Sequence, residues 1–163
     1  MNRAEVLNPS GGVLRSDTWG DGRWRAARGT RDHMGVDHVV MPGQPIIAPA
    51  PGFVSRRSAP YAPSSGDWWH HSANVGLVID TVGLVDHVKP PPVLFLWYVR
   101  PLPGIVGSTV AAGQVVAIAE SVAGLYRRRY PDEEVAMLDH VHLELRWPGA
   151  EKIRLEPIVV PWA

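Results

Sequence analysis

From about residue 36, short segments of β-branched and apolar residues alternate with turns rich in Gly and Pro. This pattern is typical of strands and leaves little room for long helices. We expect strands at residues 36–41, 44–48, 52–56, 74–80, 84–88 and 93–100, a hairpin formed by residues 109–111 and 114–119, and a short helix at residues 121–129. The chain is thus predicted to adopt an all-β fold, mainly an antiparallel sheet, with few short helices.

The most regular alternation lies in residues 139–147. Its apolar positions fall on one face of a strand, which we expect to be buried, and its polar positions fall on the other: His140, His142, Glu144 and Arg146. His140 and His142 then lie about 7 Å apart, so that one imidazole can bind a metal ion while the other reaches a water molecule on it. A solvent-exposed polar face is the simpler alternative.

A second group of metal-ligating residue types lies in His33-Met34-Gly35-Val36-Asp37. The glycine and the valines that follow favour a turn leading into a strand over a helix. Such a bend can bring the imidazole and the carboxylate onto one cation, and two imidazoles with one carboxylate are a common catalytic zinc set. Each spacing alone is a weak signal, and only their joint occurrence in a β-rich chain indicates a metal site.

Composition restricts the chemistry further. The chain has no cysteine, so any metal site must use His, Asp and Glu. Its 16 basic and 16 acidic residues cancel, which argues against a nucleic-acid partner bound through a strong positive field. The longest apolar run, residues 93–99, is too short for a transmembrane segment, and residues 1–15 lack the apolar stretch of a signal peptide.

Residues 1–30 are rich in Gly and Arg and form a distinct N-terminal region. Six arginines stand against three acidic residues up to position 31. We expect an irregular arm that Trp19 and Trp24 pack onto a β domain spanning residues 31–163. The alternative is an arginine-rich arm that docks a partner protein.

Four motifs follow one another in the order of a known family. They are His33-x-Gly35-x-Asp37, PGQPIIAPAPGFV at residues 42–54, VAAGQVV at residues 110–116 and HVHLE at residues 140–144. Together they resemble the lysostaphin/LytM-type zinc endopeptidases, which have the Gly-Gly/DD-endopeptidase fold. The resemblance covers roughly residues 30–147 of the chain.

The resemblance implies a zinc metallopeptidase-like β domain at residues 31–163. It implies zinc held by His33, Asp37 and His142, with His140 as the general base or transition-state stabiliser. The implied substrate is the peptide stem or cross-bridge of bacterial peptidoglycan. A chain made in the cytoplasm without a signal peptide would reach the cell wall, or be built into a phage virion, by another route.

One position departs from the family pattern. Where the family has a second catalytic His in a Y-x-H-L strand, counting back nine residues from Gly107 gives Tyr98. Tyr98-Val99-Arg100-Pro101 instead resembles the Y-I-K-P stretch of leukocyte cell-derived chemotaxin, a non-peptidase relative. A tyrosine can donate a hydrogen bond to an oxyanion but cannot act as a cation near neutral pH. Two functions therefore stay open: a zinc metallopeptidase, and a zinc-binding structural or recognition module that is catalytically impaired.

An aromatic loop is the last candidate. Trp68 and Trp69 precede His70 in a segment that we expect to be exposed. These three residues would form a substrate-binding flap with aromatic platforms. A loop tip folded onto the body of the protein is the equal alternative.

Overall fold

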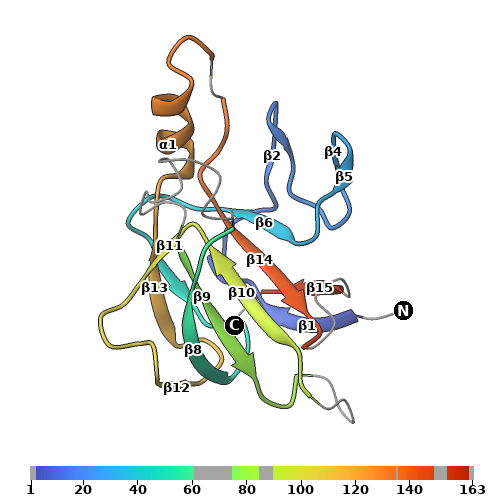
Figure 1. Ribbon diagram of the computed structural model, residues 1–163, viewed down its shortest axis with the longest axis vertical. Coiled ribbons are helices and arrows are strands. Elements are labelled where there is room, and N and C mark those ends of the chain that lie inside the picture. The colour runs from blue at the N-terminus through green and yellow to red at the C-terminus, as the bar shows by residue number, and fades with distance from the viewer. Residues whose placement is uncertain (1–2, 61–74, 85–89, 135, 149–153, 162–163) are drawn as a thin grey trace.

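A computed structural model describes residues 3–60, 75–84, 90–134, 136–148 and 154–161 (Figure 1). The first half contains β1 (Arg3–Leu7), β2 (Ser16–Asp17), β3 (Gly20–Asp21), β4 (Ala27–Arg28), β5 (Arg31–Asp32), β6 (Val36–Val39), β7 (Pro45–Ile47), β8 (Gly52–Ser58) and β9 (Gly76–Thr81). The second half contains β10 (Val93–Trp97), β11 (Val99–Pro101), β12 (Thr109–Val110), β13 (Val115–Ala119), α1 (Val122–Arg129), β14 (His140–Arg146) and β15 (Arg154–Val160). The predicted all-β fold with few helices is confirmed.

A large curled sheet forms the body of the protein. Its strands follow the order β1-β15-β14-β10-β9-β8-β12, and β6 pairs with the free part of β14. A smaller sheet, β11-β13-β7, packs beside it, and the pairings are antiparallel except for β1 with β15. In Figure 1, α1 and the β2–β5 hairpins rise from the same end of the large sheet, on either side of β14 and β6.

The alternation of residues 139–147 has the predicted effect on β14. Val141, Leu143 and Leu145 are fully buried in the main core. The other face of the strand carries His140, His142 and Glu144, which line a cavity. Strand β14 therefore joins the core to the candidate site.

Three local predictions were wrong. Residues 109–119 do not form a hairpin, because β12 pairs with β8 in the large sheet whereas β13 pairs with β7 and β11 in the smaller one. The turn between them donates the backbone N–H of Gly113 to the carbonyl of Ala48. The strand expected at residues 93–100 is broken at Tyr98, whose φ is +66°. The expected irregular arm is instead ordered, because β1 extends the large sheet and two small hairpins follow it.

The tryptophan anchors are confirmed, because Trp24 packs against the main core and Trp19 against a second apolar cluster beside α1. Most of the strand predicted at residues 84–88 and all of Trp68, Trp69 and His70 lie outside the described residues. No helix in the described part of the chain has the length and hydrophobicity to cross a bilayer.

Candidate metal centre

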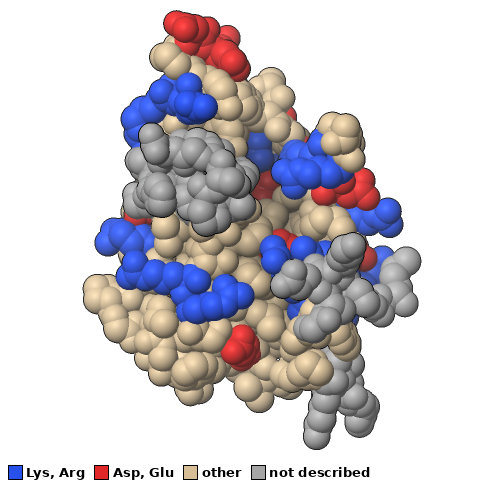
Figure 2. All heavy atoms as spheres, viewed as in Figure 1, with Lys and Arg blue, Asp and Glu red and all other residues tan. Residues whose placement is uncertain are grey.

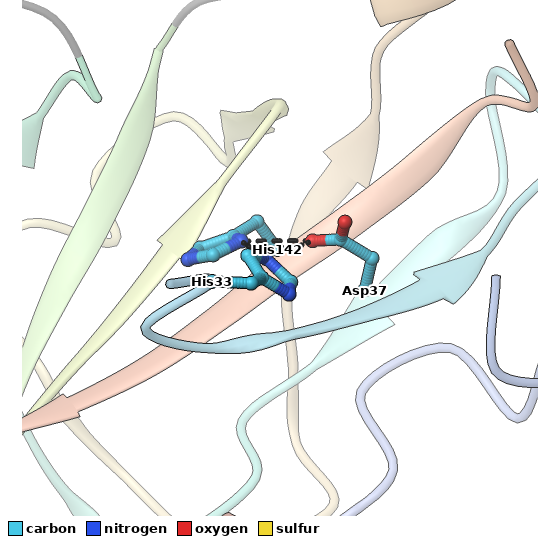
Figure 3. Close-up of side chains that lie close together, drawn as sticks. All are labelled: His33, Asp37 and His142. Carbon is cyan, nitrogen blue, oxygen red and sulfur yellow. Dashed lines mark hydrogen bonds and ion pairs between the residues drawn. The ribbon is translucent and has the colours of Figure 1, made fainter. Parts of the chain in front are cut away.

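Three metal-ligating side chains from distant parts of the chain converge at one point (Figure 3). Strand β6 pairs with β14 in a register that puts Asp37 opposite His142, and the turn before β6 carries His33. Gly35 is required in this turn, because a Cβ there would lie 2.5 Å from the Nε2 atom of His142. The His-x-Gly-x-Asp spacing therefore follows from the close passage of the turn over β14.

The three ligand atoms lie at distances that fit one tetrahedral zinc ion. His33 Nε2 lies 3.1 Å from His142 Nδ1 and 3.2 Å from Asp37 Oδ1, and His142 Nδ1 lies 2.8 Å from Asp37 Oδ1. Zinc–nitrogen bonds of about 2.0–2.1 Å place neighbouring tetrahedral ligands about 3.3 Å apart. Only a small expansion of the group is needed to hold the ion.

Hydrogen bonds orient the first imidazole of the group. His33 Nδ1 lies 3.0 Å from the carbonyl oxygen of Arg23. Because a carbonyl only accepts, Nδ1 carries the proton and Nε2 presents its lone pair to the metal position. The ring is therefore held in the tautomer that a metal ligand needs.

The carboxylates around His142 set its charge in the metal-free protein. Burial acts against protonation, but the hydrogen bond to Asp37 and the nearby Glu144 raise the pKa of His142 to about 9. Burial also opposes ionisation of Asp37, yet His140, His142 and His33 hold its pKa well below the usual value. A metal ion at this point would replace the proton on His142.

A buried arginine fixes the far side of Asp37. Arg15 Nη1 lies 3.1 Å from Asp37 Oδ2, and the Arg15 side chain is only 4% exposed. The same guanidinium donates two hydrogen bonds to Asp17, of 2.7 and 2.8 Å. With Oδ2 engaged, the carboxylate presents Oδ1 to the metal position, as a ligand held by its surroundings should.

The same network reaches His140. Asp17 accepts a 2.9 Å hydrogen bond from the backbone N–H of Leu138, and the carbonyl of Leu138 accepts one of 2.8 Å from His140 Nδ1. The Nε2 atom of His140 therefore carries the lone pair and lies 3.9 Å from Asp37 Oδ2. Burial lowers the pKa of His140 despite the attraction of Asp37, so that its imidazole is neutral at neutral pH.

The site opens into a cavity of about 320 Å³. Figure 2 shows it as a hollow between α1 and the β2–β5 hairpins, with basic side chains at its rim. Tyr98 lines the cavity, with its ring 5.1 Å from that of His140 in an edge-on arrangement. A non-glycine residue at positive φ is uncommon, and such strained positions are concentrated at functional sites.

The described structure brings together five of the residues named from sequence: His33, Asp37, His140, His142 and Tyr98. Sequence reasoning missed Arg15 and Asp17, which pair with each other at 2.7 Å, because the Gly- and Arg-rich segment around them shows no periodicity. It also missed Trp97, whose ring stacks on that of His142 at 5.0 Å. An apolar run gives no indication that one of its members faces a histidine.

Comparison with solved structures establishes the fold. Lysostaphin in solution matches with a TM-score of 0.56 at 14% identity, covering 92% of this chain and 50% of that one. A catalytic-domain mutant of the prophage-encoded M23 protein EnpA from Enterococcus faecalis matches with a TM-score of 0.52 at 21% identity, covering 88% of this chain and 87% of that one. Csd3 from Helicobacter pylori matches with a TM-score of 0.51 at 16% identity, covering 88% and 30% respectively.

The chain therefore has the lysostaphin/LytM-type fold, as its four motifs predicted. It spans half the length of lysostaphin, which is an antimicrobial peptidase from Staphylococcus simulans. No family model and no curated protein sequence matches the chain.

Proposed function

We propose that this protein is a zinc-dependent endopeptidase that hydrolyses peptide cross-links of bacterial peptidoglycan. The observation that carries the proposal is the convergence of His33, Asp37 and His142 on one point that opens into a cavity. The likeness to lysostaphin, a peptidase of the same fold, supports it. The substrate would be a peptide stem or cross-bridge, and the protein would act at the cell wall or as part of a phage virion.

Each residue of the site has a role in this proposal. His33, Asp37 and His142 would hold the zinc ion, which when bound polarises a peptide carbonyl and lowers the pKa of water. The neutral imidazole of His140, which lines the same cavity, would accept the proton of the attacking water. The Tyr98 phenol would donate a hydrogen bond to the oxyanion that develops on the carbonyl.

A zinc-binding recognition module with impaired catalysis is the second candidate. The tyrosine at position 98, where the family has a histidine, favours it. The loss of one oxyanion-stabilising group costs about two to three orders of magnitude in turnover. Under either function, Trp68, Trp69 and His70 would contact the substrate, and the basic N-terminal region would contact partner proteins.

Cell-wall hydrolysis with defined metal content tests the proposal. Purified peptidoglycan is incubated with the zinc-loaded protein, with the chelated protein and with His140→Ala, and new amino termini are counted. We expect release by the zinc-loaded protein alone, restored to the chelated protein by added zinc. Zinc binding without release of amino termini at any concentration would leave the recognition module as the function.

A further inference from the structure

The β4–β5 hairpin places two arginines at the mouth of the cavity. Arg28 and Arg31 are direct partners across this hairpin, which turns at Gly29 with φ +64°. Both side chains line the cavity that contains the candidate metal centre. Like charges directly opposite each other destabilise a strand pair. The pairing of Arg28 with Arg31 therefore lowers the stability of the hairpin, and nothing within the hairpin offsets this loss.

Neighbouring arginines have acidic partners and Arg28 is paired with Asp37, but Arg31 differs from them. Arg23 is paired with Asp21 at 2.5 Å and Arg25 with Asp32 at 3.2 Å, both on the surface. Arg31, in contrast, has no ion pair or hydrogen bond within the described part of the chain. Its guanidinium therefore keeps its donors for a group that enters the cavity.

The carboxylates of the cavity already have cationic partners. Asp37 Oδ2 is contacted by both Arg15 and Arg28, each at 3.1 Å. Glu144 is held by Arg146 at 3.0 Å and also contacts Arg154. Neither acid is left to neutralise Arg31, and a divalent ion at the metal centre would add further positive charge. The cavity as a whole therefore favours an anionic ligand.

The chain also makes room for one of the two guanidiniums. A side chain at Gly20 would collide with the Nη1 atom of Arg28, so that the glycine lets the guanidinium lie against β3. That Nη1 atom is buried and has no hydrogen-bond partner within the described residues. Among the contacts of the described residues, it is Nη2 of Arg28 that is engaged, by Asp37.

From this arrangement we infer that Arg28 and Arg31 form a subsite for a carboxylate of the bound peptide. The inference rests on the proposed function, because it assumes that a peptide enters this cavity. Arginine binds carboxylates through paired hydrogen bonds with a defined geometry. Arg28 contacts Asp37, which would hold the metal, so a peptide carboxylate bound by Arg28 would lie close to the reacting bond. We therefore assign this carboxylate to the peptide residue that carries the reacting bond or to the next residue of the peptide.

Two sources of such a carboxylate are chemically equivalent here: the free C-terminus of a peptide stem and an acidic side chain beside the cleaved bond. Three acetylated tripeptides separate them. Acetyl-Lys-D-Ala-D-Ala has a terminal carboxylate, its C-terminal amide has none, and the amide of acetyl-Lys-D-Glu-D-Ala has a side-chain carboxylate only. Their dissociation constants are measured by calorimetry on the full chain, zinc-loaded and chelated, at low salt.

We expect at least one carboxylate peptide to bind the zinc-loaded protein about tenfold more tightly than the neutral amide, and the stronger of the two identifies the source. Arg31→Gln should reduce the preference to about twofold. The matched control Arg25→Gln removes an equal charge nearby but outside the cavity lining, and should retain the full preference.

Equal binding of the three peptides would overturn the inference, as would equal preferences in Arg31→Gln and Arg25→Gln. A preference that survives Arg31→Gln but disappears on chelation would also overturn it, because the carboxylate would then bind the metal. Hydrolysis is measured separately. Cleavage without a carboxylate preference would contradict only the subsite, and a preference that depends on Arg31 without cleavage would contradict only the peptidase.

Discussion

The cavity has two walls, and the sequence determines the positions of their side chains with different firmness. The metal wall consists of His33, Asp37, His140, His142 and Glu144, all of which are buried. The aromatic wall consists of Trp19, Tyr98, Val122, Tyr126 and Met137, which belong to the smaller apolar cluster.

Because the two walls differ, we expect metal binding to depend on the metal wall and catalytic turnover to depend also on the aromatic wall. Ligand geometry on the metal wall is fixed from several directions at once, by Arg15, by the backbone of Arg23 and by the β6–β14 register. Catalytic assistance from the aromatic wall would depend on Tyr98 alone. Metal binding should therefore tolerate changes in the aromatic wall, whereas turnover should not.

The largest effect is expected at His142. His142→Ala would remove one of the three proposed ligands, and the other two could not complete a tetrahedral set. Zinc content should fall from about one ion per chain to none after dialysis, as measured by elemental analysis, and the thermal midpoint should no longer rise when zinc is added.

His38→Ala is the matched control for this change. His38 is buried on the same strand as Asp37, but it bonds to the carbonyl of Gly12 and does not belong to the ligand group. This variant should keep its zinc. If His142→Ala and the wild-type protein carried equal amounts of zinc, the metal wall would not be the zinc site.

The next effect concerns the connection between the N-terminal region and the metal wall. Asp17→Asn leaves the buried Arg15 with Asp37 as its remaining acidic partner. Breaking a buried ion pair from one side destabilises proteins by about 3 kcal/mol or more. Urea unfolding at pH 7 should show a loss of this order. Asp21→Asn, which removes a more exposed pair with Arg23, should cost less than about 1 kcal/mol.

The cost of Asp17→Asn should depend on pH in one direction. Burial acts to raise the pKa of Asp17, but hydrogen bonds from Arg15 and from the Leu138 N–H outweigh it and the pKa lies below its usual value. A depressed pKa stabilises the fold above the unfolded value of about 3.9 and ceases to do so as pH falls through the folded value. The difference between wild type and variant should therefore shrink below about pH 4. A constant difference down to pH 2 would mean that the charge of Asp17 is unimportant.

Much of the metal wall could be predicted because its information is local. Alternation in residues 139–147 fixes which side of β14 carries His140 and His142, and the glycine of His-x-Gly-x-Asp is required by the turn over that strand. Arg15 could not be assigned in this way. Its role depends on a chain path that brings Arg15 beside Asp37, where the Arg15 N–H donates to the Asp37 carbonyl. A Gly- and Arg-rich segment gives no periodicity from which to infer that path.

The break at Tyr98 is hidden for a different reason. Residues 93–99 form one apolar run, and neither glycine nor proline occurs between Val93 and Pro101, so the segment predicts an unbroken strand. The left-handed φ of Tyr98 is imposed by tertiary pairing, because β10 continues the large sheet while β11 joins β13 in the smaller one.

Tyr98 is the position where the aromatic wall should affect catalysis. Tyr98→Phe removes the phenolic donor and should lower turnover by about ten- to a thousand-fold, while zinc content stays at about one ion per chain. Tyr98→His introduces the histidine that the lysostaphin/LytM-type pattern has at this position and should raise turnover. Both are measured as the rate of amino-terminus release from peptidoglycan. A parallel loss of zinc in Tyr98→Phe would show that the two walls are not independent.

The smallest effect is expected at the start of α1, which supplies Val122 and Tyr126 to the aromatic wall. Ser121 caps this helix: its hydroxyl accepts a 2.9 Å hydrogen bond from the N–H of Gly124. Replacement of such a cap by alanine costs about 1 kcal/mol. Ser121→Ala should therefore lower the unfolding free energy by about that amount without changing zinc affinity in a chelator competition, because no metal ligand touches the helix cap. A drop in zinc affinity that exceeded the measured loss of stability would mean that the aromatic wall supports the metal wall directly, and the separation of binding from turnover would fail.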